Sequence, residues 1–232
     1  MKNPAAKKKL TPVTLVTGAS SGIGAALAGV FAANGHLLAL TARRKSHLED
    51  VASAITAAGG KPPIVIVADL ATPAGADRLV RSLKTRDLEV ASLINAAGFA
   101  RAGATAALDA EQQLTMIDLN ARALTDLCLR FAESIARRRG GILNVAAAGK
   151  SSDGMAVYAA TKAYVLSLSE ALFKELAPRV RVSALCFDLS TTPLREVAEA
   201  GYRGFVRGDR VITPRFAHRA RSLAARLSRR HV

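Results

Sequence analysis

The hydrophobic positions of this 232-residue chain fall in short β-branched or leucine-rich runs, which alternate with alanine-rich stretches of ten or more residues. This alternation is typical of βαβ units, which build a parallel sheet covered by helices on both faces. Because crossovers of this kind are right-handed, the pattern predicts a doubly wound α/β fold. The predicted strands are residues 13–17, 37–41, 64–67, 92–95, 141–145 and 180–186.

The length and composition of the chain favour a single domain. Half of its residues are hydrophobic, and no internal repeat, low-complexity linker or compositional break interrupts residues 10–200. A single α/β domain of this size buries a sizeable core. We therefore expect a Rossmann-fold domain over residues 12–214, preceded by a basic extension at residues 1–11 and followed by a basic helix at residues 215–232.

Cysteine usage and the first residues bear on where the protein works. Cys128 and Cys186 lie far apart in apolar contexts, which fits buried thiols in a reducing compartment better than a disulfide framework. The apolar run after the lysine-rich start is short and contains Pro12 and Thr14, so we expect neither a signal peptide nor a membrane span. The cysteines and four histidines show no metal-ligand spacing. The sequence thus favours a soluble cytoplasmic protein without a metal.

The formal charge of +15 is concentrated at the two ends of the chain. Residues 2–9 carry four lysines, and residues 203–232 carry nine arginines against the single acid Asp209. The tail has the pattern of an amphipathic helix with a cationic face, for which a solvated terminal helix is the simpler interpretation. Binding of this tail to nucleic acid or to an acidic membrane surface is the alternative.

The first predicted strand runs directly into the sequence TGASSGIG, residues 17–24, and then into a helical stretch. Gly18 permits a tight turn, Gly22 lets backbone approach a phosphate, and Gly24 lets the new helix pack against the strand. The helix N-terminus offers free N–H groups and a positive dipole end to a diphosphate. This strand–turn–helix setting predicts a dinucleotide site rather than a purely structural glycine turn.

The end of the second predicted strand bears on which dinucleotide binds. A free ribose 2′-hydroxyl usually meets an acid about twenty residues beyond the glycines, whereas a 2′-phosphate requires cations there. This chain reads LTARRKSHLED, with Arg43 and Arg44 at the strand end and no acid before Glu49. NADP(H) is therefore favoured over NAD(H), although the arginines could also belong to a solvated helix start.

Five motifs, in this order and spacing, resemble the short-chain dehydrogenase/reductase family. They are TGASSGIG, Asp69-Leu70 after the third strand, NAAG at residues 95–98, Asn120 in the next helix and Tyr158-x-x-x-Lys162. The resemblance covers about residues 12–186 and is greatest to the NADP(H)-preferring carbonyl reductases. It implies a Rossmann fold and a small-molecule carbonyl or alcohol substrate.

The resemblance also implies a set of cofactor contacts. Asp69 would hydrogen-bond the adenine amino group with Leu70 beside it, and small side chains at residues 95–98 would line the path of the cofactor. Relatives carry a second asparagine where Ala96 stands. The implied cofactor-binding residues are Gly18, Ser20, Ser21, Gly22, Ile23, Gly24, Arg43, Arg44, Asp69, Leu70, Asn95, Ala97, Gly98, Tyr158 and Lys162.

The resemblance assigns catalysis to three residues. Tyr158 would be the general acid or base at the substrate oxygen, and Asn120 would hold a water that relays protons from Lys162 to solvent. A free phenol has a pKa of about 10, so ionisation near neutrality requires about 4 kcal/mol of help. One cation about 4 Å away supplies about that much at an effective dielectric constant near 20. Lys162 is one helical turn from Tyr158 and would also bind the nicotinamide ribose.

One departure from the family removes a hydroxyl from the substrate site. Relatives place a serine at the position of Ala147, where its side chain binds the substrate oxygen. Loss of one such donor typically costs about 2.7–4 kcal/mol of transition-state stabilisation. Ser151 or Ser152 could replace it only by folding back from a loop that is shorter than in relatives.

Further departures lie close by. Phe187-Asp188 replaces the Pro-Gly of relatives, and we expect the aromatic ring and the carboxylate to crowd the nicotinamide pocket. Thr191 or Thr192 could still meet the carboxamide. The segment that follows is also shorter than the mobile lid of relatives.

Two functions of different classes follow from these residues. The first is an NADP(H)-dependent oxidoreductase that interconverts a carbonyl and a secondary alcohol, and the alternative is a dinucleotide-binding sensor or scaffold with little turnover. By resemblance we expect a homodimer or homotetramer that pairs through helices near residues 111–139 and 156–177. Tyr164, Leu168 and Leu172 form an apolar stripe on the second helix, unless they face the sheet instead.

Overall fold

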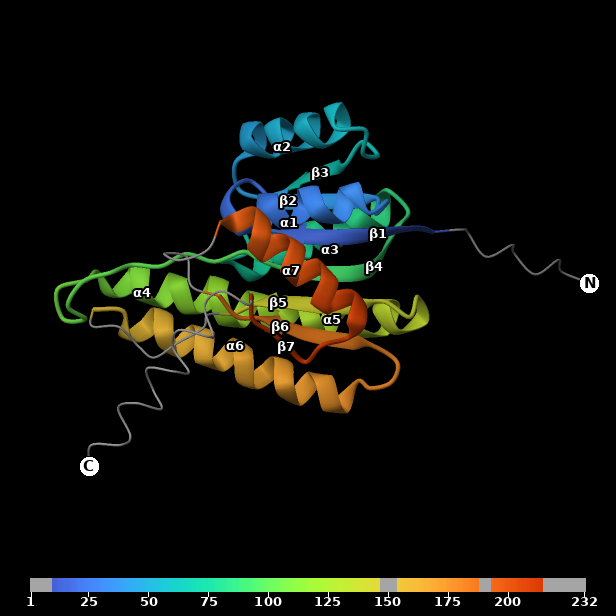
Figure 1. The fold of residues 1–232 in the computed structure, drawn as a ribbon. Helices are drawn as coiled ribbons and strands as arrows, with labels where there is room; N and C mark the ends of the chain where they lie inside the picture. Colours follow the sequence, from blue (N-terminus) through green and yellow to red (C-terminus); the bar gives the residue numbers. More distant parts are fainter. Residues whose placement is uncertain (1–9, 147–153, 188–192, 215–232) are drawn as a thin grey trace, which may run out of the picture.

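The computed structural model describes residues 10–146, 154–187 and 193–214, which form one parallel sheet between two layers of helices (Figure 1). The strands are β1 (Thr11–Thr17), β2 (Leu38–Ala42), β3 (Ile64–Val67), β4 (Leu88–Asn95), β5 (Gly141–Val145), β6 (Arg181–Leu185) and β7 (Val211–Ile212). The helices are α1 (Gly22–Ala33), α2 (Lys45–Ala57), α3 (Pro73–Thr85), α4 (Ala110–Ile117), η1 (Asp118–Ala123), α5 (Leu124–Arg137), α6 (Ala156–Glu175) and α7 (Leu194–Arg207).

The strand order is β3-β2-β1-β4-β5-β6-β7, and every neighbouring pair is parallel. This order confirms the doubly wound Rossmann fold predicted from the alternating runs. The two central strands β1 and β4 form the point where the strand order reverses. The sequence pattern missed β7 because it has only two residues, too few to form a hydrophobic run.

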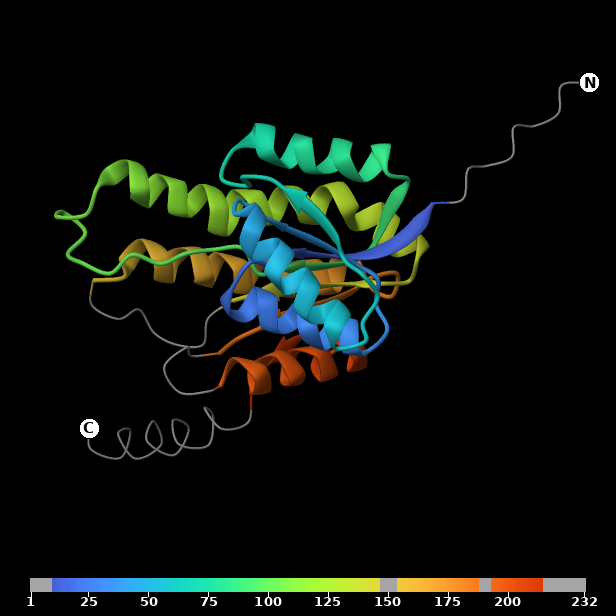
Figure 2. The same ribbon diagram turned by 90° about the horizontal axis from the view of Figure 1, so that it is seen from above.

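Side chains of successive strand residues enter two separate hydrophobic cores. Leu93 and Ile142 pack on the face that α3, α5 and α6 cover, whereas the next residues, Ile94 and Leu143, pack on the face covered by α1, α2 and α7. Figures 1 and 2 show these two helical layers on either side of the sheet. Because both faces are buried, the strands are continuously hydrophobic rather than alternating.

The helix expected near residues 111–139 is divided into three consecutive pieces. Residues Asp118–Ala123 form a π-helical segment between α4 and α5. Such segments are rare and occur frequently at functional sites. This one carries Asn120, whose side chain is fully buried.

None of the helices in the described ranges is long and apolar enough to span a membrane. The same ranges contain no group of three His, Cys, Asp or Glu side chains that could hold a metal ion. Cys128 and Cys186 are free and buried, as expected, and burial raises the pKa of their thiols to about 12 and about 11. The basic ends at residues 1–9 and 215–232 lie outside the described residues, so the domain limits remain predictions.

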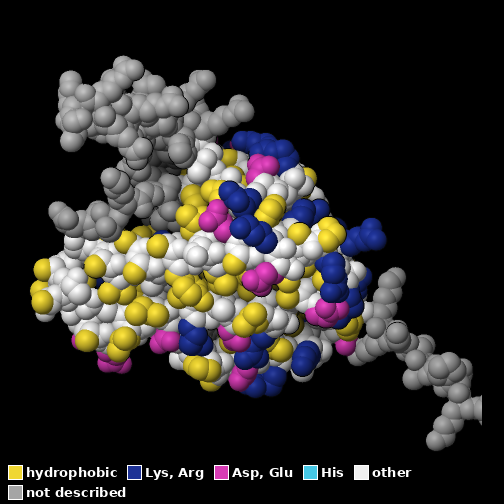
Figure 3. All heavy atoms as spheres, turned by 90° about the horizontal axis from the view of Figure 1, so that it is seen from below, with side chains coloured by type: hydrophobic (Ala, Val, Ile, Leu, Met, Phe, Trp, Pro, Cys, Tyr) yellow, Lys and Arg dark blue, Asp and Glu magenta, His cyan; other side chains and the backbone are white. Residues whose placement is uncertain are grey.

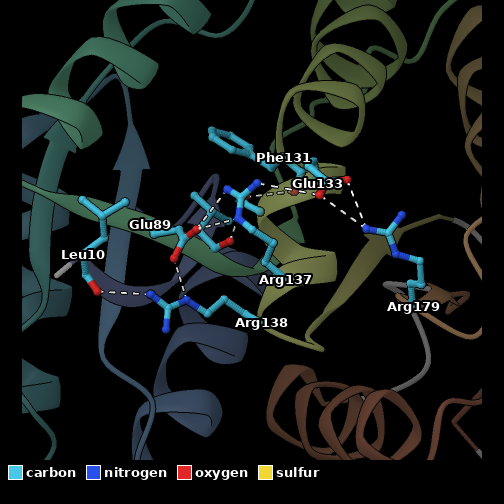
Figure 4. Close-up of polar contacts among 9 residues, drawn as sticks. Leu10, Glu89, Phe131, Glu133, Arg137, Arg138 and Arg179 are labelled. Carbon is cyan, nitrogen blue, oxygen red and sulfur yellow. Dashed lines mark hydrogen bonds and ion pairs between the residues drawn. The ribbon is translucent and has the colours of Figure 1, made fainter. Parts of the chain in front are cut away.

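A buried carboxylate near the start of β4 connects this strand to the end of α5 (Figure 4). Glu89 is only 9% exposed and accepts hydrogen bonds from Arg137 Nη2 at 3.0 Å and Arg138 Nε at 2.5 Å. Arg138 also donates to the carbonyl oxygen of Leu10 at 3.2 Å. Burial raises the pKa of the Glu89 carboxyl, but the two guanidinium groups outweigh it, so the pKa is lowered overall.

We predict that Glu89→Gln lowers the free energy of unfolding by about 1–3 kcal/mol at pH 7, because two guanidinium groups lose their anionic partner. The carboxylate has a lowered pKa in the folded state, so its contribution is present above the unfolded-state pKa and is lost as the pH falls through the folded value. Urea unfolding at pH 7 and at acid pH measures both effects.

The matched control is Glu133→Gln. Glu133 is 64% exposed and pairs with Arg137 and Arg179, which are also exposed (Figure 4). Such a surface pair contributes less than about 1 kcal/mol. Equal losses of stability in the two variants would contradict a special role for Glu89.

Candidate active site

A crevice of about 330 Å³ opens at the carboxyl ends of β1, β2, β3 and β4. This is where ligands bind in open parallel sheets, because the crossover connections diverge there. Twelve of the predicted cofactor residues lie in its wall, namely Gly18, Ser20, Ser21, Gly22, Ile23, Gly24, Arg43, Arg44, Asp69, Leu70, Ala97 and Gly98. Ala42, Ala68, Ala96 and Leu119 complete the lining.

Close backbone contacts at the end of β1 explain the glycines in this wall. Gly18 has a φ of +64°, and a Cβ atom there would lie 2.7 Å from the Cα atom of Ala97. A Cβ atom at Gly24 would overlap the carbonyl group of Gly18. The hydroxyl of Thr17 accepts hydrogen bonds from the N–H groups of Ala96 and Ala97 at 3.1 and 3.0 Å, which fixes β1 against β4. The turn therefore places backbone atoms that no side chain covers at the floor of the crevice.

Two arginines stand beside the start of α1. Arg44 Nη2 donates to Ser21 Oγ at 3.3 Å, and Arg43 also lines the crevice. The first turn of α1 contains no acid. A phosphate group placed here would meet guanidinium, hydroxyl and free N–H donors, so the donor set fits the phosphates of a dinucleotide.

The loop after β3 forms the opposite wall of the crevice. Asp69 Oδ1 accepts a hydrogen bond from the N–H group of Ala71 at 3.1 Å, and the hydroxyl of Thr72 caps α3. Leu70 is 3% exposed and packs into the core beside Asp69. The hydrogen bond from Ala71 holds the carboxylate of Asp69 in the wall of the crevice.

Asn95 lies beneath the crevice, apart from the other predicted cofactor residues. Its Nδ2 donates to Asn144 Oδ1 at 2.9 Å and to the sulfur of Cys128 at 3.4 Å. Asn144 in turn donates to Ser169 Oγ at 3.0 Å. The buried network joins β4 to β5 and α6, so the side chain of Asn95 supports the sheet rather than lining the crevice. This role follows from the contacts of Asn95 in the structure and could not be predicted from the NAAG motif.

Two of the three predicted catalytic residues, Asn120 and Lys162, lie beside Gly98, and the ring of Tyr158 lies near Lys162. Asn120 is held in place because it donates to the carbonyl oxygen of Phe99 at 3.0 Å and accepts from the N–H group of the same residue at 3.1 Å. It also donates to Thr161 Oγ1 at 3.2 Å. A Cβ atom at Gly98 would lie 2.8 Å from Asn120 Oδ1 and 3.7 Å from Lys162 Nζ, so glycine is required for the close approach.

Lys162 lies near Tyr158 and is hydrogen-bonded to a neighbouring strand. Lys162 is 8% exposed, and its Nζ donates to the carbonyl oxygen of Val145 at 2.9 Å. The same nitrogen lies 5.8 Å from the centre of the Tyr158 ring. Burial raises the pKa of the Tyr158 phenol and lowers the pKa of Lys162 to about 8. The ammonium group of Lys162 is thus hydrogen-bonded to β5 while it lies over the ring of Tyr158, and its expected help to a phenolate stays a prediction.

The structure describes only some of the positions at which the substrate side of this sequence departs from the family. The side chain of Phe187 is 5% exposed and belongs to the core beneath α1 and α7, so the expectation that its ring projects from the chain into the nicotinamide pocket is wrong. Its apolar ring is stabilised by burial, which keeps it in the core. The other positions of interest lie outside the described residues, namely Ala147, Ser151, Ser152, Asp188, Thr191 and Thr192.

An apolar groove of about 680 Å³ lies on the outer surface between η1, α5 and α6. Leu129, 68% exposed, and Tyr164, 45% exposed, line it, and Figure 3 shows hydrophobic side chains gathered on this side of the molecule. Leu168 and Leu172, which the sequence placed with Tyr164, pack toward the sheet instead. Ile117 and Leu129 also line the groove, and they were not predicted from the sequence because no apolar stripe was named on the helix expected near residues 111–139.

This site, a glycine-rich crevice beside a cluster of buried Asn120, buried Lys162 and half-buried Tyr158, defines a dinucleotide-binding Rossmann domain. The chain belongs to the short chain dehydrogenase family, which matches residues 12–202. A 3-oxoacyl-[acyl-carrier-protein] reductase from Synechocystis sp. is 30% identical over 189 residues, covering 79% of this chain and 76% of that protein.

Two solved structures share the fold. A short-chain dehydrogenase from Sphingobium yanoikuyae, in complex with NADPH, is 34% identical with a TM-score of 0.79, covering 95% of this chain and 94% of that one. A bulky-bulky ketone specific alcohol dehydrogenase from Comamonas testosteroni is 31% identical with a TM-score of 0.80, covering 96% and 93%.

We predict that Lys162→Met raises the free energy of unfolding by about 1–2 kcal/mol at pH 7, because the buried ammonium group destabilises the folded state. The pKa of Lys162 falls to about 8 on folding, so its unfavourable contribution is complete below pH 8 and is relieved as the pH rises toward the unfolded value. The difference from wild type should therefore shrink between pH 7 and pH 10 in urea unfolding. Lys174→Met, at an exposed position of the same helix, is the control and should show neither effect.

Proposed function

We propose that this protein is an NADP(H)-dependent oxidoreductase that interconverts a carbonyl and a secondary alcohol on a small molecule. The observation that carries the proposal is the junction at Gly98, where the crevice wall meets the buried side chains of Asn120 and Lys162. A ligand that follows the crevice would reach the phenol of Tyr158 at this junction. The relatives named above, a ketone specific alcohol dehydrogenase and a 3-oxoacyl reductase, agree with carbonyl chemistry.

In this proposal, different residues of the crevice bind different parts of the cofactor. The backbone at Gly18 and the N-terminus of α1 bind the diphosphate, and Arg43 and Arg44 bind the 2′-phosphate. Asp69 and Leu70 receive the adenine. When bound, NADPH supplies the hydride. NAD(H), which lacks the 2′-phosphate, binds less tightly because both guanidinium groups then have no anionic partner.

The environment of Tyr158 suits a proton donor. Burial raises the pKa of the phenol, so the hydroxyl stays protonated near neutral pH and can protonate a carbonyl oxygen. Lys162 sits within the same cluster, where its ammonium group can bind a ribose hydroxyl and the relay through Asn120 can replace the proton. The protonated phenol is the form that reduction of a carbonyl requires.

A second candidate function is a dinucleotide-binding sensor or scaffold with little turnover. The presence of Ala147, where relatives have serine, favours it, because a missing donor to the substrate oxygen slows chemistry without affecting the crevice. The retention of Tyr158 and Asn120 argues against it, since binding alone requires neither.

The protein is also proposed to form homodimers through the apolar groove that Leu129 and Tyr164 line. An exposed apolar surface of this kind marks an interaction site in soluble proteins. Sedimentation at micromolar concentration tests this, and a monomer alone would reject it. We place the protein in the cytoplasm, where its two buried free thiols would stay reduced.

We predict that Tyr158→Phe lowers the rate of NADPH oxidation with ketones and aldehydes by about 10²–10⁴-fold, because the proton donor is lost, while NADPH still binds. Ala147→Ser should raise the rate of the parent protein by about 10²–10³-fold. Stopped-flow oxidation of bound NADPH measures both. Equal turnover by wild type and Tyr158→Phe would remove Tyr158 from the mechanism, and an inert wild type with an active Ala147→Ser would favour the sensor.

We predict that the double substitution of Arg43 and Arg44 by alanine weakens NADPH binding by about 10–100-fold, since two charge-assisted contacts to one phosphate are lost. NADH binding should change by less than about threefold, because this coenzyme lacks the 2′-phosphate. Calorimetric titration with both coenzymes makes the comparison. A parallel loss for the two ligands would place the 2′-phosphate elsewhere.

A further inference from the structure

Arg122 connects the two halves of the candidate site. It lies on the π-helical segment η1, and its Nη2 donates to the carbonyl oxygen of Ala71 at 2.8 Å. Its Nε donates to Asp118 Oδ1, also at 2.8 Å, one helical turn earlier. The side chain is 34% exposed. Asp118 therefore orients the guanidinium group, and the Nη2 end of this group reaches the loop after β3.

The two ends of this bridge have different tasks in the proposed function. Ala71 directly follows Asp69 and Leu70, and its own N–H group donates to the Asp69 carboxylate at 3.1 Å. At the other end, Asn120 precedes Arg122 by two residues on the same π-helical segment. The guanidinium group is thus bonded to the loop that would receive adenine and belongs to the segment that carries a catalytic side chain.

We propose that Arg122 is a positioning residue that couples occupancy of the adenine end of the crevice to the order of the Asn120 segment. This inference rests on the proposed function, because it assumes that a dinucleotide occupies the crevice. A π-helical segment leaves its extra residue without the regular α-helical bonding pattern, so side-chain anchors determine its position. Asn120 anchors it to Phe99 and α6, and Arg122 anchors it to the loop after β3.

The chain offers a matched control in Arg130. Its Nε donates to Asp126 Oδ1 at 2.7 Å within α5, and its Nη1 pairs with Asp77 Oδ1 of α3 at 2.9 Å. Its side chain is 35% exposed. Arg130 therefore makes the same kind of bridge from the same helical region to α3, but it contacts neither the loop at Ala71 nor the Asn120 segment.

The test uses 2′,5′-ADP, a fragment that carries the adenine and the 2′-phosphate but no nicotinamide. Hydrogen exchange of the full chain is followed over residues 118–123 with and without saturating fragment. In wild type and in Arg130→Ala, the fragment should slow exchange of these amides about tenfold or more. In Arg122→Ala the slowing should fall below about twofold, and Arg122→Lys, whose one nitrogen cannot reach Asp118 and Ala71 with the geometry of the guanidinium fork, should lie between.

Calorimetry with the same fragment separates this inference from the proposed function. If wild type does not bind the fragment, the proposed function fails and the inference falls with it. If wild type binds but residues 118–123 show no slowing, or if Arg122→Ala responds as wild type does, the coupling is overturned while the proposed function stands. Sedimentation of each variant establishes an equal association state, because Arg122 also lines the apolar groove. With NADPH and a ketone, Arg122→Ala should lower kcat about tenfold.

Discussion

The site depends on one steric constraint, the close contact between the turn after β1 and the end of β4. Gly18 lies so near the backbone of Ala97 that no side chain fits between them, and the hydroxyl of Thr17 accepts hydrogen bonds from the N–H groups of Ala96 and Ala97, which directly follow β4. This contact brings the N-terminus of α1 and the NAAG segment to one crevice. Gly98 then continues the wall toward Asn120 and Lys162, so the crevice and the predicted catalytic residues share one backbone path.

The buried cluster beyond Gly98 shows how function is placed at a cost to stability. An ammonium group that is 8% exposed, with a carbonyl oxygen as its only hydrogen-bond acceptor in the described structure, opposes folding. The rest of the fold offsets this through two cores that cover both faces of the sheet. Such unfavourable groups collect at active sites, since the structure around them holds them in position.

The sequence predicted the sheet and the crevice well because both follow from local rules. The hydrophobic runs located six strands. The glycine spacing located the turn after β1, which lines the same crevice as Arg43, Arg44 and Asp69. Three features could not be read in this way. Asn95 belongs to a network with Asn144 and Ser169 that only tertiary contacts reveal, and the π-helical segment has no pattern distinct from an α-helix. The direction of the Lys162 ammonium group depends on β5, far away in sequence.

Burial shifts the pKa values of both Tyr158 and Lys162. The ammonium group of Lys162 donates to Val145 and lies over the ring of Tyr158, whereas burial raises the pKa of the phenol and so favours its protonated form near neutral pH. A proton donor is needed for carbonyl reduction, whereas oxidation of an alcohol requires the phenolate and hence a cation close to the oxygen. In the proposed function the protonated phenol is therefore the starting form for reduction and the phenolate, with the cation beside it, the starting form for oxidation, so the same two side chains would serve both directions.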